Sequence, residues 1–241
     1  MRILNRILSA LITITLIFQI QINAQIVDDT IETRGTAGVL MNEDGIEFKR
    51  FHYSKEKGID NGYLFYQLAG TPDFYIDLTL REPQEANANR SFRMVFVHAK
   101  TNSGDKSWFT PVWISNGKLY ATIGNRNNAV LDIGNNWHSL RFIFTVNASK
   151  TYDMKIMHIK NGAYEELASG AVGSGDLTSL AGWVMINNGA LGGDEIYDLA
   201  NFKVRTGSSE NDDSQLKEAE KFNKKPSFDS IDNVKERDLF I

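Results

Sequence analysis

The chain has 241 residues, no cysteine and a formal net charge of −4 at pH 7. The lack of cysteine excludes a disulfide framework, a thiol nucleophile and a lipidated cysteine. The mildly acidic balance argues against a general nucleic-acid binder, which needs a concentrated basic surface. With 19 Gly, 4 Pro and 11% aromatic residues, the composition favours turn-rich β structure.

The N-terminal segment has the pattern of a secretory signal peptide. Arg2 and Arg6 flank the start of an apolar core at residues 7–18, and a small residue, Ala24, follows. The apolar run is too short and too interrupted to cross a membrane as a helix. We therefore expect residues 1–24 to be removed, and a soluble, secreted protein to be released.

Residues 25–205 are expected to form one domain built of short alternating strands. Between residues 35 and 205 we find no convincing helical spacing, and turn residues separate the apolar runs. The predicted strands are residues 45–53, 63–68, 74–81, 91–100, 108–114, 118–123, 137–146, 152–159, 183–187 and 199–205. This number of strands, with irregular loop lengths, predicts an all-β, two-sheet antiparallel jelly-roll sandwich.

Residues 91–124 contain three successive strands with an isolated histidine. Alternation places Phe96, His98 and Lys100 on one face of the first strand. The dipeptide Asn-Gly at residues 116–117 predicts a tight hairpin between the next two strands. In a regular hairpin, Trp113 and Tyr120 point to the same side.

Two arginines are predicted to point away from the core. Alternation in residues 137–146 turns Arg141 outward, and the same reasoning in residues 74–81 turns Arg81 outward. Both are candidate ligand contacts. For Arg141, an ion pair with Asp153 or Glu166 on a neighbouring strand is the alternative.

The composition changes after residue 205, where the chain becomes dense in charge and poor in β-branched residues. We expect residues 206–241 to form a polar, flexible C-terminal tail. Residues 214–222 are compatible with a short amphipathic helix, but a helix of this length is marginal in isolation.

Four runs of the chain resemble strands of known β-sandwich families. The runs WHSLRFIFTVNASKTYDMKIMHIKNGAYEE and IYDLANFKVR resemble strands of concanavalin A-like and laminin G-like sandwiches. The strand VFVHAK, with the later GKLYATIG, resembles the Gln-Ile-His strand and its successor in jelly-roll alginate lyases. The layout is also similar to the short ulvan lyases of polysaccharide lyase family 28. Phe96 stands where the motif has glutamine, and the Arg-x-Glu-Leu-Arg and Tyr-Phe-Lys-x-Gly-x-Tyr runs of the alginate lyases are not found.

The resemblance implies a secreted, endo-acting lyase that cleaves an ulvan-like, uronic-acid polysaccharide by β-elimination. This reaction needs a base for the C5 proton, an acid for the leaving oxygen and a group that neutralises the carboxylate. The predicted base is His98, whose ordinary pKa is about 6.5, and the predicted acid is Tyr120. The predicted substrate contacts are Arg141, Lys100, Arg81, Trp113 and Asn187. Burial of Trp113 would remove its role as a platform for a sugar ring.

Several alternatives stay open. His98 and the aromatic residues can simply be packed in the sandwich, and His52, His138 and His158 are expected to be structural. A non-catalytic, laminin G-like carbohydrate-binding module would use Trp113 and Tyr75, and an adhesion domain would have no sugar site. Residues 194–198 lack the carboxylate order of a retaining glucanase. We find no catalytic-serine or zinc pattern in the sequence.

We expect no required cofactor, with structural calcium as a candidate ligand of residues 173–176 or 192–195. The expected partner is an acidic polysaccharide rather than nucleic acid or membrane, and the expected state is a monomer.

Overall fold

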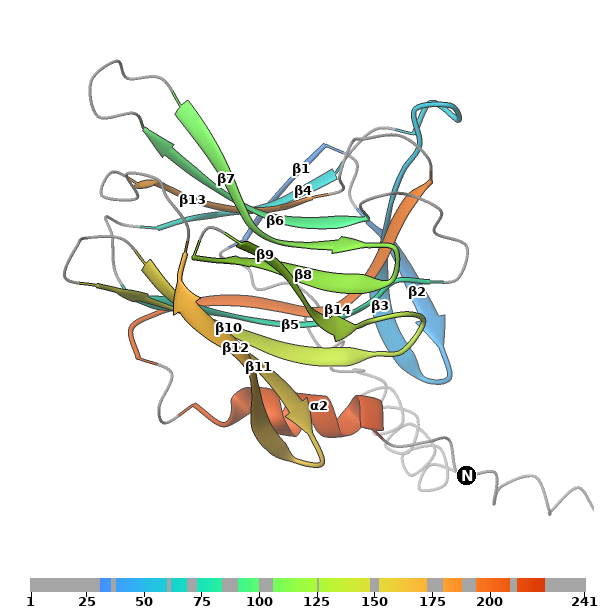
Figure 1. Ribbon diagram of the computed structural model, residues 1–241. Helices are drawn as coiled ribbons and strands as arrows, with labels where there is room; N and C mark the ends of the chain where they lie inside the picture. The colour runs from blue at the N-terminus through green and yellow to red at the C-terminus, as the bar shows by residue number, and fades with distance from the viewer. Residues whose placement is uncertain are drawn as a thin grey trace, which may run out of the picture.

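A computed structural model describes residues 31–35, 38–59, 62–68, 73–83, 91–99, 106–124, 126–147, 152–172, 180–187, 194–208 and 212–223. Within them, two antiparallel sheets of seven strands each pack face to face (Figure 1). The predicted signal peptide and Lys100 lie outside the described residues. In the part that is described, no helix is long and apolar enough to cross a membrane.

Sheet A contains the strands nearest the C-terminal helix in Figure 1. Its order is β12 (Ala163–Ala171), β11 (Tyr152–Lys160), β10 (His138–Val146), β5 (Phe74–Arg81), β14 (Glu195–Thr206), β3 (Ile46–Tyr53) and β2 (Val39–Glu43). Sheet B has the order β1 (Glu32–Gly35), β4 (Gly62–Gln67), β13 (Leu180–Asn187), β6 (Phe92–Ala99), β7 (Lys106–Ser115), β8 (Lys118–Ile123) and β9 (Arg126–Asp132).

The core lies between the sheets and is rich in phenylalanine. Phe74 and Phe144 stack with ring centroids 4.7 Å apart, and Phe96 of sheet B meets Phe144 edge-on at 4.9 Å. These rings are fully buried, and each side chain of this kind contributes about 1.5–3 kcal/mol when removed from water. The apolar residues that alternate along the strands thus pack between the two sheets, as predicted.

The β7–β8 hairpin has the predicted turn. Asn116 and Gly117 have φ values of 51° and 71°, the left-handed conformation that a two-residue turn of this type requires. Trp113 pairs in register with Tyr120 across the hairpin.

The four outermost strands of the two sheets, β1, β2, β9 and β12, were not predicted. Strand β2 is exposed along its length, with Val39 and Leu40 at 61% and 59% exposure. At the other edge of sheet A, the chain leaving β12 bridges to sheet B, where Gly124 N donates to Ala171 O at 2.6 Å. Just before this bridge, a Cβ on Gly170 would lie 2.7 Å from Ile123.

The C-terminal segment differs from the expected flexible tail. Helix α2 (Ser214–Asn223) packs on the outer face of sheet A (Figure 1). Gln215 donates to the carbonyl of Leu78 at 3.3 Å and accepts from Asn201 at 2.6 Å. Phe222 contacts Trp137 at a ring distance of 5.5 Å. These tertiary contacts stabilise a helix that would be marginal alone.

Candidate functional site

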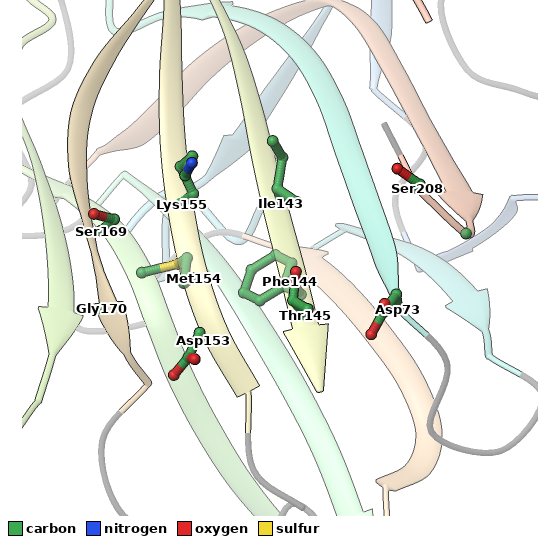
Figure 2. Close-up of a pocket in the computed structure, with 11 residues that line it drawn as sticks. Asp73, Ile143, Phe144, Thr145, Asp153, Met154, Lys155, Ser169, Gly170 and Ser208 are labelled. Carbon is green, nitrogen blue, oxygen red and sulfur yellow. The ribbon is translucent and has the colours of Figure 1, made fainter. Parts of the chain in front are cut away.

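A groove of about 510 Å³ lies on the outer face of sheet A (Figure 2). Its lining combines hydrogen-bonding side chains with the aliphatic side chain of Ile143. The lining residues are Asp73, Ile143, Phe144, Thr145, Asp153, Met154, Lys155, Ser169, Gly170, Gly207 and Ser208. Neither the groove nor most of its lining was predicted, because Thr145, Asp153 and Ser169 form no motif in the sequence.

Strand register connects this groove to a cluster of charged groups. Ser169 pairs with Lys155, and Lys155 pairs with Ile143. Ile143 in turn pairs with Tyr75, which pairs with Arg205. One row of residues across five strands therefore runs from the groove to the side chains of Tyr75 and Arg205.

Arg141 is the centre of this cluster. Its guanidinium donates to both carboxylate oxygens of Asp77 at 2.7 and 2.9 Å. The rings of Tyr75 and Tyr164 lie 4.8 and 4.9 Å from the guanidinium carbon, in cation–π contact. Arg141 is only 2% exposed. It points away from the core as predicted, but its strongest partner is Asp77 rather than Asp153 or Glu166.

The remaining groups of the cluster converge on Asp212, just before helix α2. Tyr75 donates its hydroxyl to Oδ2 at 2.6 Å, and Arg205 Nε and Arg141 Nη2 lie 3.3 and 3.7 Å from the same oxygen. Arg141 Nη1 also donates to the backbone carbonyl of Asp212 at 2.7 Å. We call Tyr75, Arg141, Arg205 and Asp212 the carboxylate clamp.

The clamp changes the acidity of its members. Burial acts to raise the pKa of Asp212, but hydrogen bonds from Ser214 and Tyr75 and the charge of Arg141 outweigh it and hold the pKa far below its usual range. Burial, assisted by the neighbouring Asp212 carboxylate, raises the pKa of Tyr75 to about 12. At neutral pH, Asp212 is therefore ionised and Tyr75 is a hydrogen-bond donor.

Arg81 belongs to a second, separate cluster on the same face. It donates to Asp198 at 2.8 Å and to Glu43, and its guanidinium lies over the Trp137 ring at 4.6 Å. Arg50 donates to Asp198 at 2.7 and 2.9 Å. Arg81 is nearly fully buried. The expectation that Arg81 is open to a substrate carboxylate is corrected. Its guanidinium is buried and already hydrogen-bonded to the carboxylates of Asp198 and Glu43.

Trp113 and Tyr120 lie on the other layer, on the outer face of sheet B. Their rings stack with centroids 5.5 Å apart and an interplanar angle of 7°. Trp113 is only 8% exposed. The expectation that Trp113 offers a flat surface to a sugar ring is therefore corrected, because burial removes that role.

Asn187 and His98 are placed by backbone register. Asn187 pairs with Arg93, which pairs with Trp113, so Asn187, Trp113 and Tyr120 occupy one row across sheet B. His98 pairs with Ser107 and Leu180. Phe96, which alternation groups with His98, faces the core. The side chains of His98 and Asn187 lie outside the described part of the structure.

The other histidines have structural contacts. His138 Nε2 lies 3.0 Å from the carbonyl of Ile133, and its Nδ1 lies 3.3 Å from His158 Nε2. Burial lowers the pKa of both rings, and the His158 charge lowers that of His138 further. The ring of His52 contacts Asp194, which also accepts from Lys57.

A metal site would need several ligating side chains close together. Across the described ranges, no group of three or more His, Asp and Glu residues is placed to hold a metal ion. Residues 173–176, one of the two predicted calcium segments, lie outside these ranges.

Comparison with solved structures assigns the fold class. A carbohydrate esterase from the Shiga toxin-encoding bacteriophage phi24B matches with a TM-score of 0.52 and 14% identity, over 74% of this chain and 90% of that chain. Alginate lyase A1-II', of polysaccharide lyase family 7, gives 0.46 and 11%, over 72% and 86%. The lumenal domain of VIP36, bound to calcium and a mannose-containing glycan, gives 0.45 and 8%, over 76% and 86%.

At these identities the likeness establishes the fold alone: the protein is an all-β jelly-roll sandwich, as predicted. No protein-family model matches the sequence, and no curated protein matches it.

Proposed function

We propose that this protein binds a polysaccharide in the groove of sheet A. The observation that carries the proposal is the lining of the groove, which combines the polar side chains of Thr145, Asp153, Lys155 and Ser169 with the aliphatic side chain of Ile143. A sugar ring presents hydroxyl donors and acceptors around its edge and C–H groups on its faces. A groove with a few polar groups around an apolar floor suits such a ligand.

The fold gives this proposal general support. The phage protein that shares the sandwich is described as a carbohydrate esterase. A shared fold does not determine function, so the proposal depends on the groove and its chemistry.

The test is a pair of matched substitutions on opposite layers. Thr145→Trp fills the groove, whereas Thr122→Trp adds the same bulk on β8 of sheet B. Retention in affinity gels containing ulvan, alginate, glucuronan or pectin should be lost in Thr145→Trp and kept in Thr122→Trp. Equal retention of both variants, or no retention of the wild-type protein by any polymer, would contradict the proposal.

Cleavage by β-elimination is the second candidate function. It is favoured by Arg141 and Arg205, which lie at one carboxylate near the groove, since this reaction requires that the uronate carboxylate be neutralised. A base takes the C5 proton, the C4–O bond breaks as the C4–C5 double bond forms, and an acid protonates the leaving oxygen. His98 and Tyr120 belong to sheet B, whereas both arginines lie on sheet A, so these groups do not meet at one sugar residue. We retain His98 as the proposed base and Tyr120 as the proposed acid of a separate site on sheet B, and the neutralising group of that site is not assigned.

Ultraviolet absorbance of the unsaturated uronyl product separates the two functions. A rise with one polymer that is lost in both His98→Ala and Tyr120→Phe would support the lyase with these roles. A rise that persists in both variants would remove His98 and Tyr120 from the mechanism. Retention in the gel without any absorbance change would leave binding as the function.

The proposal has consequences for where the protein acts. We propose that residues 1–24 act as a signal peptide for export and that the protein is a monomer. Its proposed ligand is an extracellular, uronic-acid-containing polysaccharide such as ulvan. We propose no required cofactor and keep calcium as a candidate structural ion. Size-exclusion chromatography and mass spectrometry of the secreted protein test its state and its first residue.

A further inference from the structure

The carboxylate clamp has the geometry of a binding site for an organic acid. Groups from three strands, β5, β14 and β10, converge on a single oxygen of Asp212: Tyr75 donates a hydrogen bond at 2.6 Å, and Arg205 and Arg141 lie at ion-pair distances of 3.3 and 3.7 Å. Arginine and tyrosine hydroxyl groups are the side chains that recognise carboxylates by charge-assisted hydrogen bonds.

The charge balance of the clamp depends on the C-terminal segment. With Asp212 in place, two carboxylates, Asp77 and Asp212, face two guanidinium groups, Arg141 and Arg205. When Asp212 leaves, the two arginines face Asp77 alone. The site then has excess positive charge in a partly buried position, where an anion is attracted more strongly than in bulk water.

The clamp also lies next to the groove rather than in isolation. Tyr75 is the register partner of Ile143, which lines the groove. Gly207 and Ser208, which also line it, come shortly before Asp212 in the chain. A sugar chain in the groove that extends along this row would bring its next residue to the position of the Asp212 carboxylate.

The segment that carries Asp212 is held by contacts that a ligand can replace. Asp212 is 24% exposed, so its carboxylate is reached by solvent. Helix α2 has only 10 residues, and its anchors include the buried Ala219, the polar contacts of Gln215 and the ring contact of Phe222. Short helices of this kind depend on tertiary contacts and open locally at low cost.

We propose that the clamp is a subsite for the carboxylate of an acidic sugar, and that Asp212 occupies it as an internal competitor. This inference rests on the proposed function, because it names the sugar class and the regulation of the same groove. Helix α2 would then leave the outer face of sheet A when an acidic polysaccharide binds.

The test is the affinity of the full-length secreted protein for sodium glucuronate and for glucose, measured by titration calorimetry. Asp212→Asn removes the competing charge and should tighten glucuronate binding by about tenfold or more, as expected when an occluded state is relieved. Glucose binding should not change. Adding Arg205→Ala to Asp212→Asn should abolish the gain.

Asp213→Asn is the matched control, because it removes the same charge from the next, exposed residue. The inference is overturned if Asp212→Asn binds glucuronate no more tightly than Asp213→Asn. Should Asp212→Asn fail to fold, Phe222→Ala, which loosens the helix at its far end, is judged by the same tenfold criterion.

The result is independent of the polymer experiment. Tighter glucuronate binding by Asp212→Asn, without retention of any polymer, would support the clamp and contradict the proposed function. Polymer retention that is blocked by Thr145→Trp but unaffected by Asp212→Asn, together with unchanged glucuronate affinity, would support the groove and overturn the clamp.

Discussion

The outer faces of the two sheets use the same alternating pattern for different purposes. On sheet A, the outward residues include Asp77, Arg141 and Arg81, which are buried in ion pairs. On sheet B, Trp113 and Tyr120 stack on each other. The outer face of sheet A is polar and partly covered by helix α2, whereas that of sheet B has an aromatic pair.

The difference shows that an outward position does not determine exposure. Alternation predicts which side of a strand a residue occupies, but it does not show what covers that side. On sheet A, neighbouring strands supply Asp77 to Arg141 and Asp198 to Arg81, and the C-terminal segment adds Asp212 beside Arg141. A candidate ligand contact therefore becomes an internal ion pair.

The largest effect should follow from breaking the pair at the centre of sheet A. Asp77→Ala leaves the Arg141 guanidinium buried without its bidentate partner, and we expect the free energy of unfolding to fall by about 3–5 kcal/mol. Urea denaturation measures the change. Asp153→Ala, an exposed carboxylate on the same sheet, should change stability by less than about 0.5 kcal/mol. Equal losses in the two variants would show that the buried pair has no special role.

A smaller effect is expected on sheet B. Trp113→Ala removes a nearly buried ring that stacks on Tyr120, and we expect a loss of about 3 kcal/mol in unfolding free energy. Carbohydrate retention should be unaffected in the folded variant, because the ring does not form a binding surface. If retention is lost while the circular dichroism spectrum is unchanged, the outer face of sheet B, and not that of sheet A, is the binding surface.

The cover of sheet A can be loosened without changing the sheet itself. Gln215→Ala removes the contacts to Asn201 and Leu78, at a cost of about 1–2 kcal/mol. The expected result is faster amide hydrogen exchange in helix α2, with little change in β5 and β10. Equal acceleration in the helix and in both strands would show that the helix and sheet unfold as one unit.

The histidine pair at the end of the core should give the smallest effect. Burial lowers the pKa of His138 and His158 in the folded protein, so the unfolded chain binds protons first as pH falls below about 6.5. The contribution of the two neutral histidines to the free energy of unfolding is fully present above that pH and decreases as pH falls toward the folded-state pKa values. Urea midpoints measured across this range should decline, and His158→Gln should weaken the dependence. A midpoint that rises on acidification would contradict the assignment.

This pH window is separate from that of the clamp. The pKa of Asp212 is lowered in the folded protein, so its contribution is present above the ordinary aspartate pKa of about 3.9 and is lost only at lower pH. As pH falls, His138 and His158 are therefore protonated before Asp212.

The sequence predicted the interior of the fold better than its edges. Strands such as residues 74–81 and 137–146 alternate apolar and polar residues because one side packs in the core. The four strands that were missed are the edges of the two sheets. In β2 and β9 most side chains are exposed, so burial imposes little pattern on them.

The site was less predictable because it depends on pairings between distant segments. The outward direction of Arg141 followed from local alternation, but its partners Asp77 and Asp212 lie 64 and 71 residues away. The tail was expected to be flexible because its helix is short, and the contacts of Gln215 are not visible in its composition. For His98, the lyase-like motif pointed to catalysis, whereas Phe96 in the same motif is a core residue.

The two edges of sheet A differ in how open they are to a further strand. Among the described strands, β2 has a neighbour on one side only, and its Val39 and Leu40 side chains are exposed; such an edge can add a strand from another chain. The opposite edge ends in the bridge from Ala171 to Gly124, which turns it toward sheet B. If two copies paired their β2 strands, no further copy could add to sheet A. The product would be a closed symmetric pair rather than a fibre.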